Sequence, residues 1–124
     1  MIAWSARNVR VFLAREPVDM RKQFHGLIAL AEEVLKQDPL TGHLFVYINR
    51  RRDRIKVLYW EDTGYCIWYK QLQRGTYELP PVNDQSVSIE LTMSQLSLIL
   101  DGIELGSAKQ RLRFEMPAFA STDA

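Results

Sequence analysis

Apolar and polar residues alternate along the middle of the chain, and this alternation is its clearest structural signal. Successive side chains of a β-strand point to opposite faces of the sheet. The pattern therefore predicts three strands, over residues 44–49, 54–60 and 65–72. Because the connections between them are short, we expect these strands to form an antiparallel meander.

The two turns of the meander determine which side chains share a face. Residues 50–53 form a four-residue loop, and Asp62-Thr63-Gly64 fits a three-residue hairpin loop with Gly64 in the left-handed conformation, which sets Leu58 opposite Trp68. One face then carries basic and aromatic residues, namely Phe45, Tyr47, Arg54, Lys56, Leu58, Trp60, Trp68 and Lys70. The other face is the expected core and collects Leu44, Val46, Ile48, Ile55, Val57, Tyr59, Ile67 and Tyr69.

A strand and a helix are predicted before the meander. Residues 8–14 alternate as a short strand. Asp19 is a suitable N-cap for the helix, which Pro39 and Gly42 bring to an end. The helix has one apolar stripe at helical spacing, made of Met20, Phe24, Leu27, Ile28, Ala31, Val34 and Leu35.

Another strand and helix follow the meander. Residues 86–91 alternate again, and Thr92 with Gln95 forms a capping box that starts a second amphipathic helix. Gly102 suits the end of that helix. The pattern weakens afterwards: residues 111–116 are compatible with an edge strand, and 118–124 with a disordered end.

These elements predict one small α+β domain over residues 1–104, followed by a weakly readable segment over 105–124. The sheet is expected to be antiparallel and built round a central three-stranded meander, with both helices packed on one face. A chain of 124 residues with 47% apolar and 25% charged residues has the length and composition of an ordinary globular domain.

Residue types that support catalysis or metal binding are sparse. The two histidines, His25 and His43, have no paired cysteines, which argues against a zinc site. Cys66 is the single cysteine, so an internal disulfide is excluded, and on a strand it is a packing residue more often than a nucleophile. Carboxylates sit mainly at caps and turns, and no glycine-rich phosphate loop is present. We therefore expect a protein without cofactor or metal that is not an enzyme; a nuclease-like activity is the weakest alternative.

The N-terminal residues do not resemble a signal peptide, because charged residues interrupt the apolar ones. No stretch approaches the ~20 apolar residues of a membrane span. A cytoplasmic protein without membrane contact is therefore expected.

Charge is unevenly distributed although the net charge is only +1. Residues 50–74 hold seven basic and three acidic residues, a net charge of +4, which leaves −3 for the remainder. Cations offset phosphate charge, and aromatic rings stack on exposed bases. The candidate DNA-binding residues are Arg50, Arg51, Arg52, Arg54, Lys56, Trp60, Trp68 and Lys70, with Arg21 and Lys22 as an extension. Two structural alternatives stay open: solvated arginines at a hairpin tip, and tryptophans packed under a helix.

Several blocks of the sequence carry a family resemblance. They are the run at 17–22 (PVDMRK), Asp38-Pro39, the run at 42–46 (GHLFV), the whole of 49–80 (NRRRDRIKVLYWEDTGYCIWYKQLQRGTYELP), and Leu91-Thr92 with Gln95-Leu96 and Gly102-Ile103. Together, over about Val9 to Glu104, they resemble the TnpB accessory protein of insertion-sequence-66 type transposable elements, the product of the second open reading frame in those elements.

The resemblance implies a bacterial mobile-element protein that supports transposition beside a separate, larger transposase. It implies no catalytic residues. The leading hypothesis is thus a non-catalytic accessory protein that binds DNA, for which the element ends are the expected target. The alternative is an interaction module whose aromatic face docks onto the transposase or a second copy of the chain.

Overall fold

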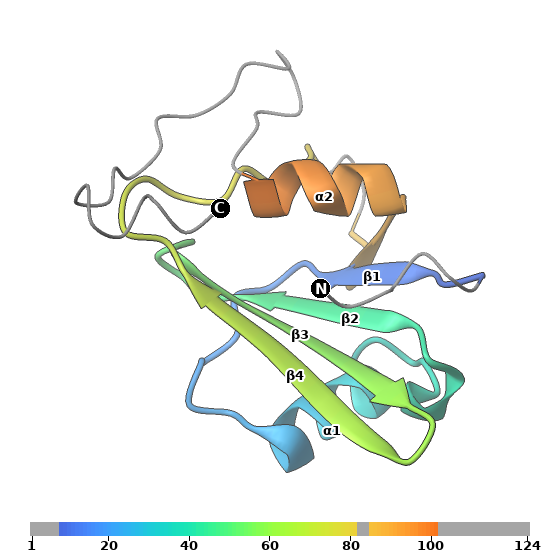
Figure 1. Ribbon diagram of the computed structural model, residues 1–124. Coiled ribbons are helices and arrows are strands. Elements are labelled where there is room, and N and C mark those ends of the chain that lie inside the picture. Colours follow the sequence, from blue (N-terminus) through green and yellow to red (C-terminus); the bar gives the residue numbers. More distant parts are fainter. Residues whose placement is uncertain (1–7, 82–84, 102–124) are drawn as a thin grey trace, which may run out of the picture.

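The protein is an α+β domain with one mixed sheet, seen in a computed structural model that describes residues 8–81 and 85–101 (Figure 1). The five strands lie in the order β4-β3-β2-β1-β5, and only β1 and β2 run parallel. The elements are β1 Val11–Ala14, α1 Phe24–Glu33, the 3-10 helix η2 Pro39–Thr41, β2 Leu44–Ile48, β3 Arg54–Glu61, β4 Gly64–Gln71, β5 Ser88–Leu91 and α2 Met93–Asp101. The α+β class is confirmed, and residues 105–124 lie outside the described part of the chain.

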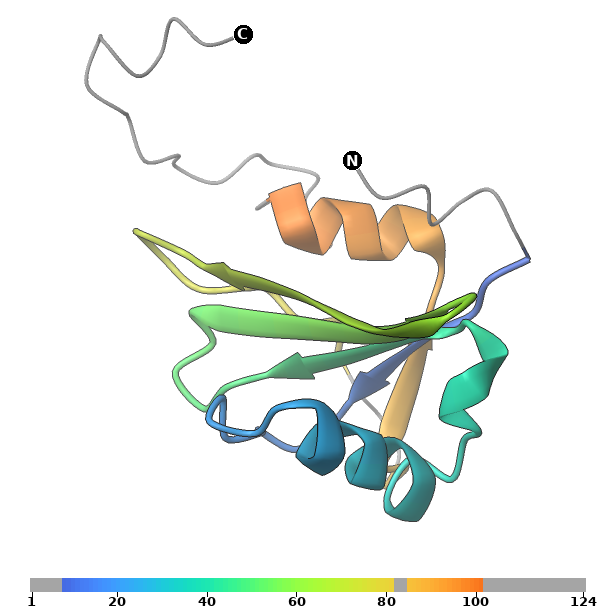
Figure 2. The ribbon, with the colours of Figure 1, turned by 60° about the horizontal axis from the view of Figure 1, so that its bottom comes forward.

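The two helices cover opposite faces of the sheet, so the prediction that both pack on one face is wrong (Figure 2). One core cluster joins α2 to residues of β1, β2 and β3 that include Val11, Val46 and Val57. The other cluster joins α1 to the opposite side chains of the same strands, including Phe45 and Leu58. We call these the α2 face and the α1 face. Because every residue of β2 is buried, β2 cannot have a solvated face.

The register between β2 and β3 agrees with the sequence, whereas the register of β4 differs by one residue. Asp62, with φ of 47°, takes the left-handed conformation in a tighter turn, and Glu61 pairs with Gly64. Asp adopts this conformation more readily than most residues. Since side chains alternate with period two, the shift exchanges the faces of the whole strand. Trp68 therefore lies opposite Val57 on the α2 face, and Ile67 lies opposite Leu58 on the α1 face.

The first helix begins later than its apolar stripe suggests. Its N-cap is Gln23, not Asp19. Asp19 instead forms a turn, in which its side chain accepts a hydrogen bond from the backbone N–H of Arg21 and its carbonyl accepts one from the backbone N–H of Lys22.

The second helix begins as predicted. The Thr92 hydroxyl accepts a hydrogen bond from the backbone N–H of Gln95, and the Gln95 side chain accepts one from the backbone N–H of Thr92.

Aspartate should be tolerated on neither face of β3. Val57 and Leu58 are adjacent, point to opposite faces and are both fully buried. We predict that Val57→Asp and Leu58→Asp each lower the free energy of unfolding by more than about 4 kcal/mol, since each buries an unpaired carboxylate. Urea unfolding measures the loss. Gln71→Asp on exposed β4 is the control, with an expected change within about 0.5 kcal/mol. A stable Leu58→Asp variant would contradict the covered α1 face.

Candidate nucleic-acid interface

An arginine-rich loop connects β2 to β3 at one end of the sheet, and Asn49 holds its backbone in shape. We call residues 50–54 the arginine loop. The Asn49 side-chain oxygen accepts hydrogen bonds from the backbone N–H groups of Asp53 and Arg54, each at 3.0 Å. Its amide nitrogen donates to the Asp53 carboxylate at 2.7 Å. The one acidic side chain of the loop is therefore engaged by a neutral partner.

Two further backbone bonds tie the arginine loop to the chain that follows β4. Arg52 takes the left-handed conformation, with φ of 59°, and its carbonyl accepts a hydrogen bond from the N–H of Tyr77 at 2.7 Å. The carbonyl of Asp53 accepts from the N–H of Leu72, also at 2.7 Å. Tyr77 is itself buried in the core of the α2 face. The loop is thus anchored on both sides, and its side chains project from a defined backbone.

The guanidinium groups of this loop have no acidic partner within residues 8–81 and 85–101. Arg50, Arg51 and Arg52 are exposed and Arg54 is half-buried, and none of them forms a salt bridge there. Four cations lie close together here, with Asp53 as the one carboxylate of the loop, and the excess of positive charge creates a positive local potential.

Arg21 joins this basic region from the turn before α1. Its guanidinium makes a two-point contact with Asp19, in which Nη2 lies 2.7 Å and Nε 3.0 Å from Oδ2. The hydrogen bonds from Arg21 lower the pKa of Asp19 to about 2. Lys22 is exposed beside it. Arg21 therefore lies at the same depression as Arg50, Arg51 and Arg54, with its charge paired to Asp19, whereas Lys22 does not line that depression.

An open depression of about 690 Å³ lies between the arginine loop and the segment that leads to α1. Four arginines line it, together with two amide side chains and two carboxylates. The lining residues are Pro17, Val18, Asp19, Met20, Arg21, Asn49, Arg50, Arg51, Asp53, Arg54 and Gln71. Arg52 instead lines a separate depression of about 330 Å³ with Arg15. A cavity bordered by several guanidinium groups is suited to an anionic ligand, because planar guanidinium forks match phosphate oxygens.

Lys56 does not lie on an accessible surface, contrary to expectation. It is only 4% exposed, and its Nζ donates to the backbone carbonyls of Met20 at 2.9 Å and Lys22 at 2.8 Å. The same nitrogen lies 4.7 Å from the centre of the Tyr69 ring. Burial lowers the pKa of Lys56. Lys56 therefore holds the turn that carries Arg21 against the sheet, instead of reaching a ligand itself.

The aromatic candidates are not brought together with the arginines. Trp68 and Lys70 point to the α2 face, where Lys70 Nζ donates to the carbonyl of Leu100 at 3.1 Å. Tyr47 is fully buried, and its hydroxyl donates to the carbonyl of Leu27. Trp60 is half-buried at the far end of β3. The prediction of one shared basic and aromatic face is therefore wrong, because both faces of the sheet are covered and the β4 register is shifted.

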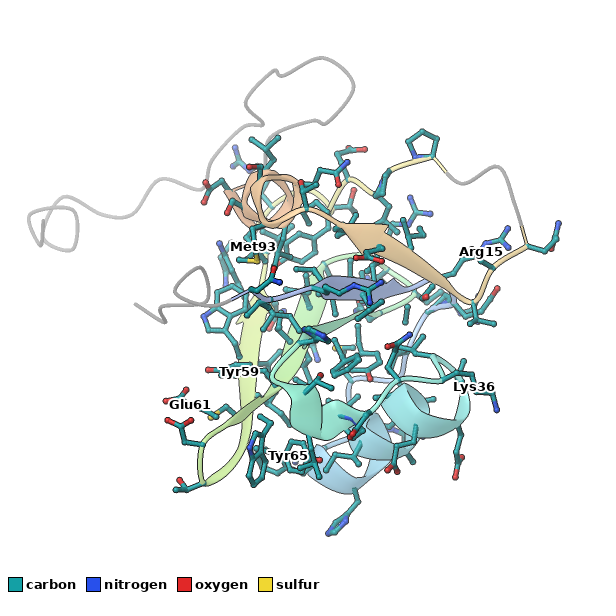
Figure 3. All side chains as sticks on the ribbon, turned by 90° about the vertical axis from the view of Figure 1, so that its right-hand side faces the viewer. Arg15, Lys36, Tyr59, Glu61, Tyr65 and Met93 are labelled. Carbon is teal, nitrogen blue, oxygen red and sulfur yellow. The ribbon has the colours of Figure 1, made fainter. Side chains whose placement is uncertain are left out.

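The far end of the sheet is acidic. Trp60 packs edge-on against Tyr65, with ring centres 5.1 Å apart, beside the exposed Glu61 and Asp62. Burial raises the pKa of the Tyr65 hydroxyl, and the charges of Glu32 and Asp38 raise it further. Figure 3 shows Glu61 and Tyr65 at one corner, well separated from Arg15. The molecule is thus polarised along the strands, basic at the arginine loop and acidic at the β3–β4 turn.

Three polar residues of the basic end were missed as part of a site. Asn49 shapes the arginine loop, Asp19 orients Arg21, and Gln71 lines the depression. An asparagine directly after a strand commonly caps the following turn through its side chain, so Asn49 carried a usable signal. Asp19 and Gln71 lie near the arginine loop only because of tertiary packing, so their place at the depression could not be predicted from the local sequence.

Two residues considered for catalysis or metal binding, His43 and Cys66, make contacts that stabilise the fold. His43 Nδ1 accepts a hydrogen bond from the backbone N–H of Arg10, and burial lowers its pKa, assisted by the charge of Arg10. Cys66 is half-buried at the margin of the α2-face core. Among the described residues, no group of three or more His, Cys, Asp or Glu side chains is placed to hold a metal ion.

Comparison with known proteins now gives the family. Residues 9–110 match the family described as "IS66 Orf2 like protein". The chain belongs to the IS66 Orf2-like family. That match confirms the resemblance and extends it a few residues beyond Glu104.

Two relatives of this IS66 Orf2-like protein come from Sinorhizobium fredii (strain NBRC 101917 / NGR234). The protein named "Uncharacterized protein y4jC" is 32% identical over 106 residues, which cover 86% of this chain and 89% of the relative. "Uncharacterized protein y4hO" is 38% identical over 100 residues, which cover 81% and 85%. No solved structure matches the chain. Neither helix of the described part has the length and apolar character needed to cross a bilayer.

The buried position of Lys56 leads to a comparison with Lys70. Both are strand lysines whose Nζ donates to a backbone carbonyl, but Lys70 is exposed. We predict that Lys56→Ala lowers the free energy of unfolding by about 2–4 kcal/mol, through a lost contact between turn and sheet and an unfilled cavity. Lys70→Ala should lower it by less than about 1 kcal/mol. Equal losses in urea unfolding would contradict the different roles given to the two lysines.

The ion pair between Asp19 and Arg21 predicts an acid titration. Because the pKa of Asp19 is about 2 in the fold and ordinarily 3.8, the pair is complete above about pH 4 and is lost as the pH falls through about 2. Carbon NMR of the Asp19 carboxyl should show this midpoint, and Arg21→Gln should move it upward. Arg10→Gln, at the other end of the sheet, is the control. An Asp19 midpoint that stays near 2 in Arg21→Gln would contradict the assignment.

Proposed function

We propose that this IS66 Orf2-like protein is a non-catalytic accessory factor in transposition that binds DNA through its arginine loop. The observation that carries the proposal is the depression lined by Arg21, Arg50, Arg51 and Arg54, in which the three loop arginines have no acidic partner among the described residues. Unpaired guanidinium groups on a well-held backbone are a suitable binding surface for a phosphate backbone.

In this proposal, fewer residues contact DNA than the sequence predicted. Arg50, Arg51, Arg52 and Arg54 reach phosphates directly, and Arg21 and Lys22 widen the surface. Lys56 acts through the turn that it holds, and Trp60, Trp68 and Lys70 make no contact with DNA. Because phosphates carry no sequence information, this surface binds element ends and other DNA with similar affinity. Recognition of particular sequences then falls to the transposase, which we propose as the protein partner.

A second candidate function, docking onto the transposase, is favoured by the opposite end of the sheet. Trp60 and Tyr65 form an aromatic pair there, and the Trp60 carbonyl lies next to Gly42, at the end of η2. Leu40 in η2 is 55% exposed. Partly exposed aromatic and aliphatic side chains rimmed by charge are typical of protein interfaces. The two functions use different ends of the molecule and are separable by mutation.

Alanine at three loop positions should test the DNA-binding surface. We predict that Arg50→Ala, Arg51→Ala and Arg52→Ala together weaken binding to element-end DNA and to random DNA by similar factors. The slope of log affinity against log salt should flatten by about 2.7, since each lost phosphate contact removes about 0.9. Fluorescence anisotropy over a salt series measures both quantities.

Two controls belong to this experiment. Arg51→Ala alone should flatten the slope by about 0.9, whereas Lys36→Asn, which removes one charge elsewhere, should leave it unchanged. Asn suits Lys36 because that residue has φ of 58°. Trp60→Ala should leave DNA affinity unchanged and weaken transposase binding only if the second candidate function holds. An unchanged slope and affinity in the triple variant would remove the arginine loop from the binding site.

A further inference from the structure

Strand β4 is a long outer strand of the sheet with no described element beyond it. It spans Gly64–Gln71 and pairs with β3 on one side only (Figure 1). The other outer strand, β5, is half as long, and its Glu90 forms a salt bridge with Arg10 at 2.6 Å. A long unpaired strand edge is a template for another strand.

The hydrogen-bond pattern shows which backbone groups face outward. In an antiparallel pair, directly bonded residue pairs alternate with non-bonded pairs. The bond from the N–H of Leu72 to the carbonyl of Asp53 continues the β3–β4 register, so the even-numbered residues of β4 bond to β3. The remaining residues therefore direct their N–H and C=O groups away from the sheet: Tyr65, Ile67, Tyr69 and Gln71.

This edge lacks the features that normally prevent pairing. β4 contains no proline, and its one charged residue is Lys70, whose Nζ is directed to the carbonyl of Leu100 on the α2 face. Three of its eight residues are aromatic, and Tyr69 is 49% exposed. Native edges usually carry bulges, prolines or outward charges instead.

Charge favours an antiparallel partner of the same kind. The arginine loop lies where β3 begins and β4 ends, because Arg54 pairs with Gln71. The acidic end lies at the β3–β4 turn, next to Tyr65. An antiparallel β4–β4 pair therefore sets the basic end of one copy beside the acidic end of the other.

We propose that two copies of this chain associate through β4, related by a two-fold axis at Trp68, to form one continuous ten-stranded sheet. The register places Ile67 opposite Tyr69 of the partner subunit and Tyr65 opposite Gln71 of the partner subunit. It satisfies every outward N–H and C=O of the edge. Trp68 then meets its own symmetry copy in a closely spaced, non-bonded pair, where aromatic cross-strand contacts are favourable. A two-fold interface uses the same surface on both copies and closes on itself.

A disulfide can report this register. Position 70 lies opposite Cys66 of the partner subunit in a non-bonded pair, whose Cα separation of about 4.5 Å suits a disulfide. Under mild oxidation we expect full-length Lys70→Cys to form covalent dimers in more than half of the chains. Lys70→Cys with Cys66→Ser, and Gln71→Cys with its side chain on the opposite face, are the controls and should not form them efficiently.

Analytical ultracentrifugation of the full-length protein measures the association itself. We expect a monomer–dimer equilibrium whose dissociation constant rises about tenfold or more in Tyr69→Glu, because a charged side chain on the edge disfavours strand pairing and replaces the contact of Tyr69 with Ile67 of the partner subunit. Val87→Glu is the matched control at the other side of the sheet; Val87 is 48% exposed, and its substitution should leave the constant unchanged. Circular dichroism checks that both variants fold.

Three results would overturn the proposal. The first is a wild-type chain that stays monomeric at all concentrations with fast amide exchange at Ile67 and Tyr69. The second is a monomer in which these amides are protected, which would mean that the chain's own residues 102–124 cover the edge. The third is a dimer without the disulfide between Lys70→Cys and Cys66, which would place the interface elsewhere. None of these results depends on DNA binding.

Discussion

Burial of β2 on both faces is the constraint on which the rest of the structure depends. All five residues of Leu44–Ile48 are buried, with β1 on one side, β3 on the other and a helix over each face. Neither face of the inner strands can therefore present a binding surface. The parts left for recognition are the two ends of the sheet and its outer strands. The arginine loop, the acidic corner and the β4 edge occupy these places.

The core and the basic end are connected through one buried charge. Lys56 donates to the carbonyls of Met20 and Lys22, on either side of Arg21. A buried ammonium group is stabilised only when its hydrogen bonds are satisfied, so the turn and the lysine hold each other in place. The position of Arg21 at the depression is thus determined by packing on the α1 face as well as by Asp19. A residue predicted as a ligand contact proves to be part of the scaffold.

The sequence predicted the local elements better than their faces. The meander, the 50–53 loop, the Thr92 capping box and the basic end all follow from alternation, turn residues and charge counts, which are local signals. The β4 register failed because Asp62 takes the left-handed conformation that was assigned to Gly64, and one residue of shift exchanges the faces of Trp68 and Ile67. Alternation also does not show how much of each face is covered. Phe45, Tyr47 and Leu58 were predicted to lie on an exposed face, but they are buried against α1.

The order of the strands has a consequence for biosynthesis. Phe12 of β1 lies opposite Phe45 in β2 and Glu90 in β5, so β1 pairs with strands from both halves of the chain. While the protein is being translated, β1, α1, β2 and the meander emerge first, because synthesis runs from the N-terminus. The second margin of β1 and the apolar α2 face stay uncovered until β5 and α2 leave the ribosome. A nascent chain that stalls before residue 88 would therefore lack β5 and expose the apolar α2 face, and exposed apolar surface of this kind is bound by chaperones.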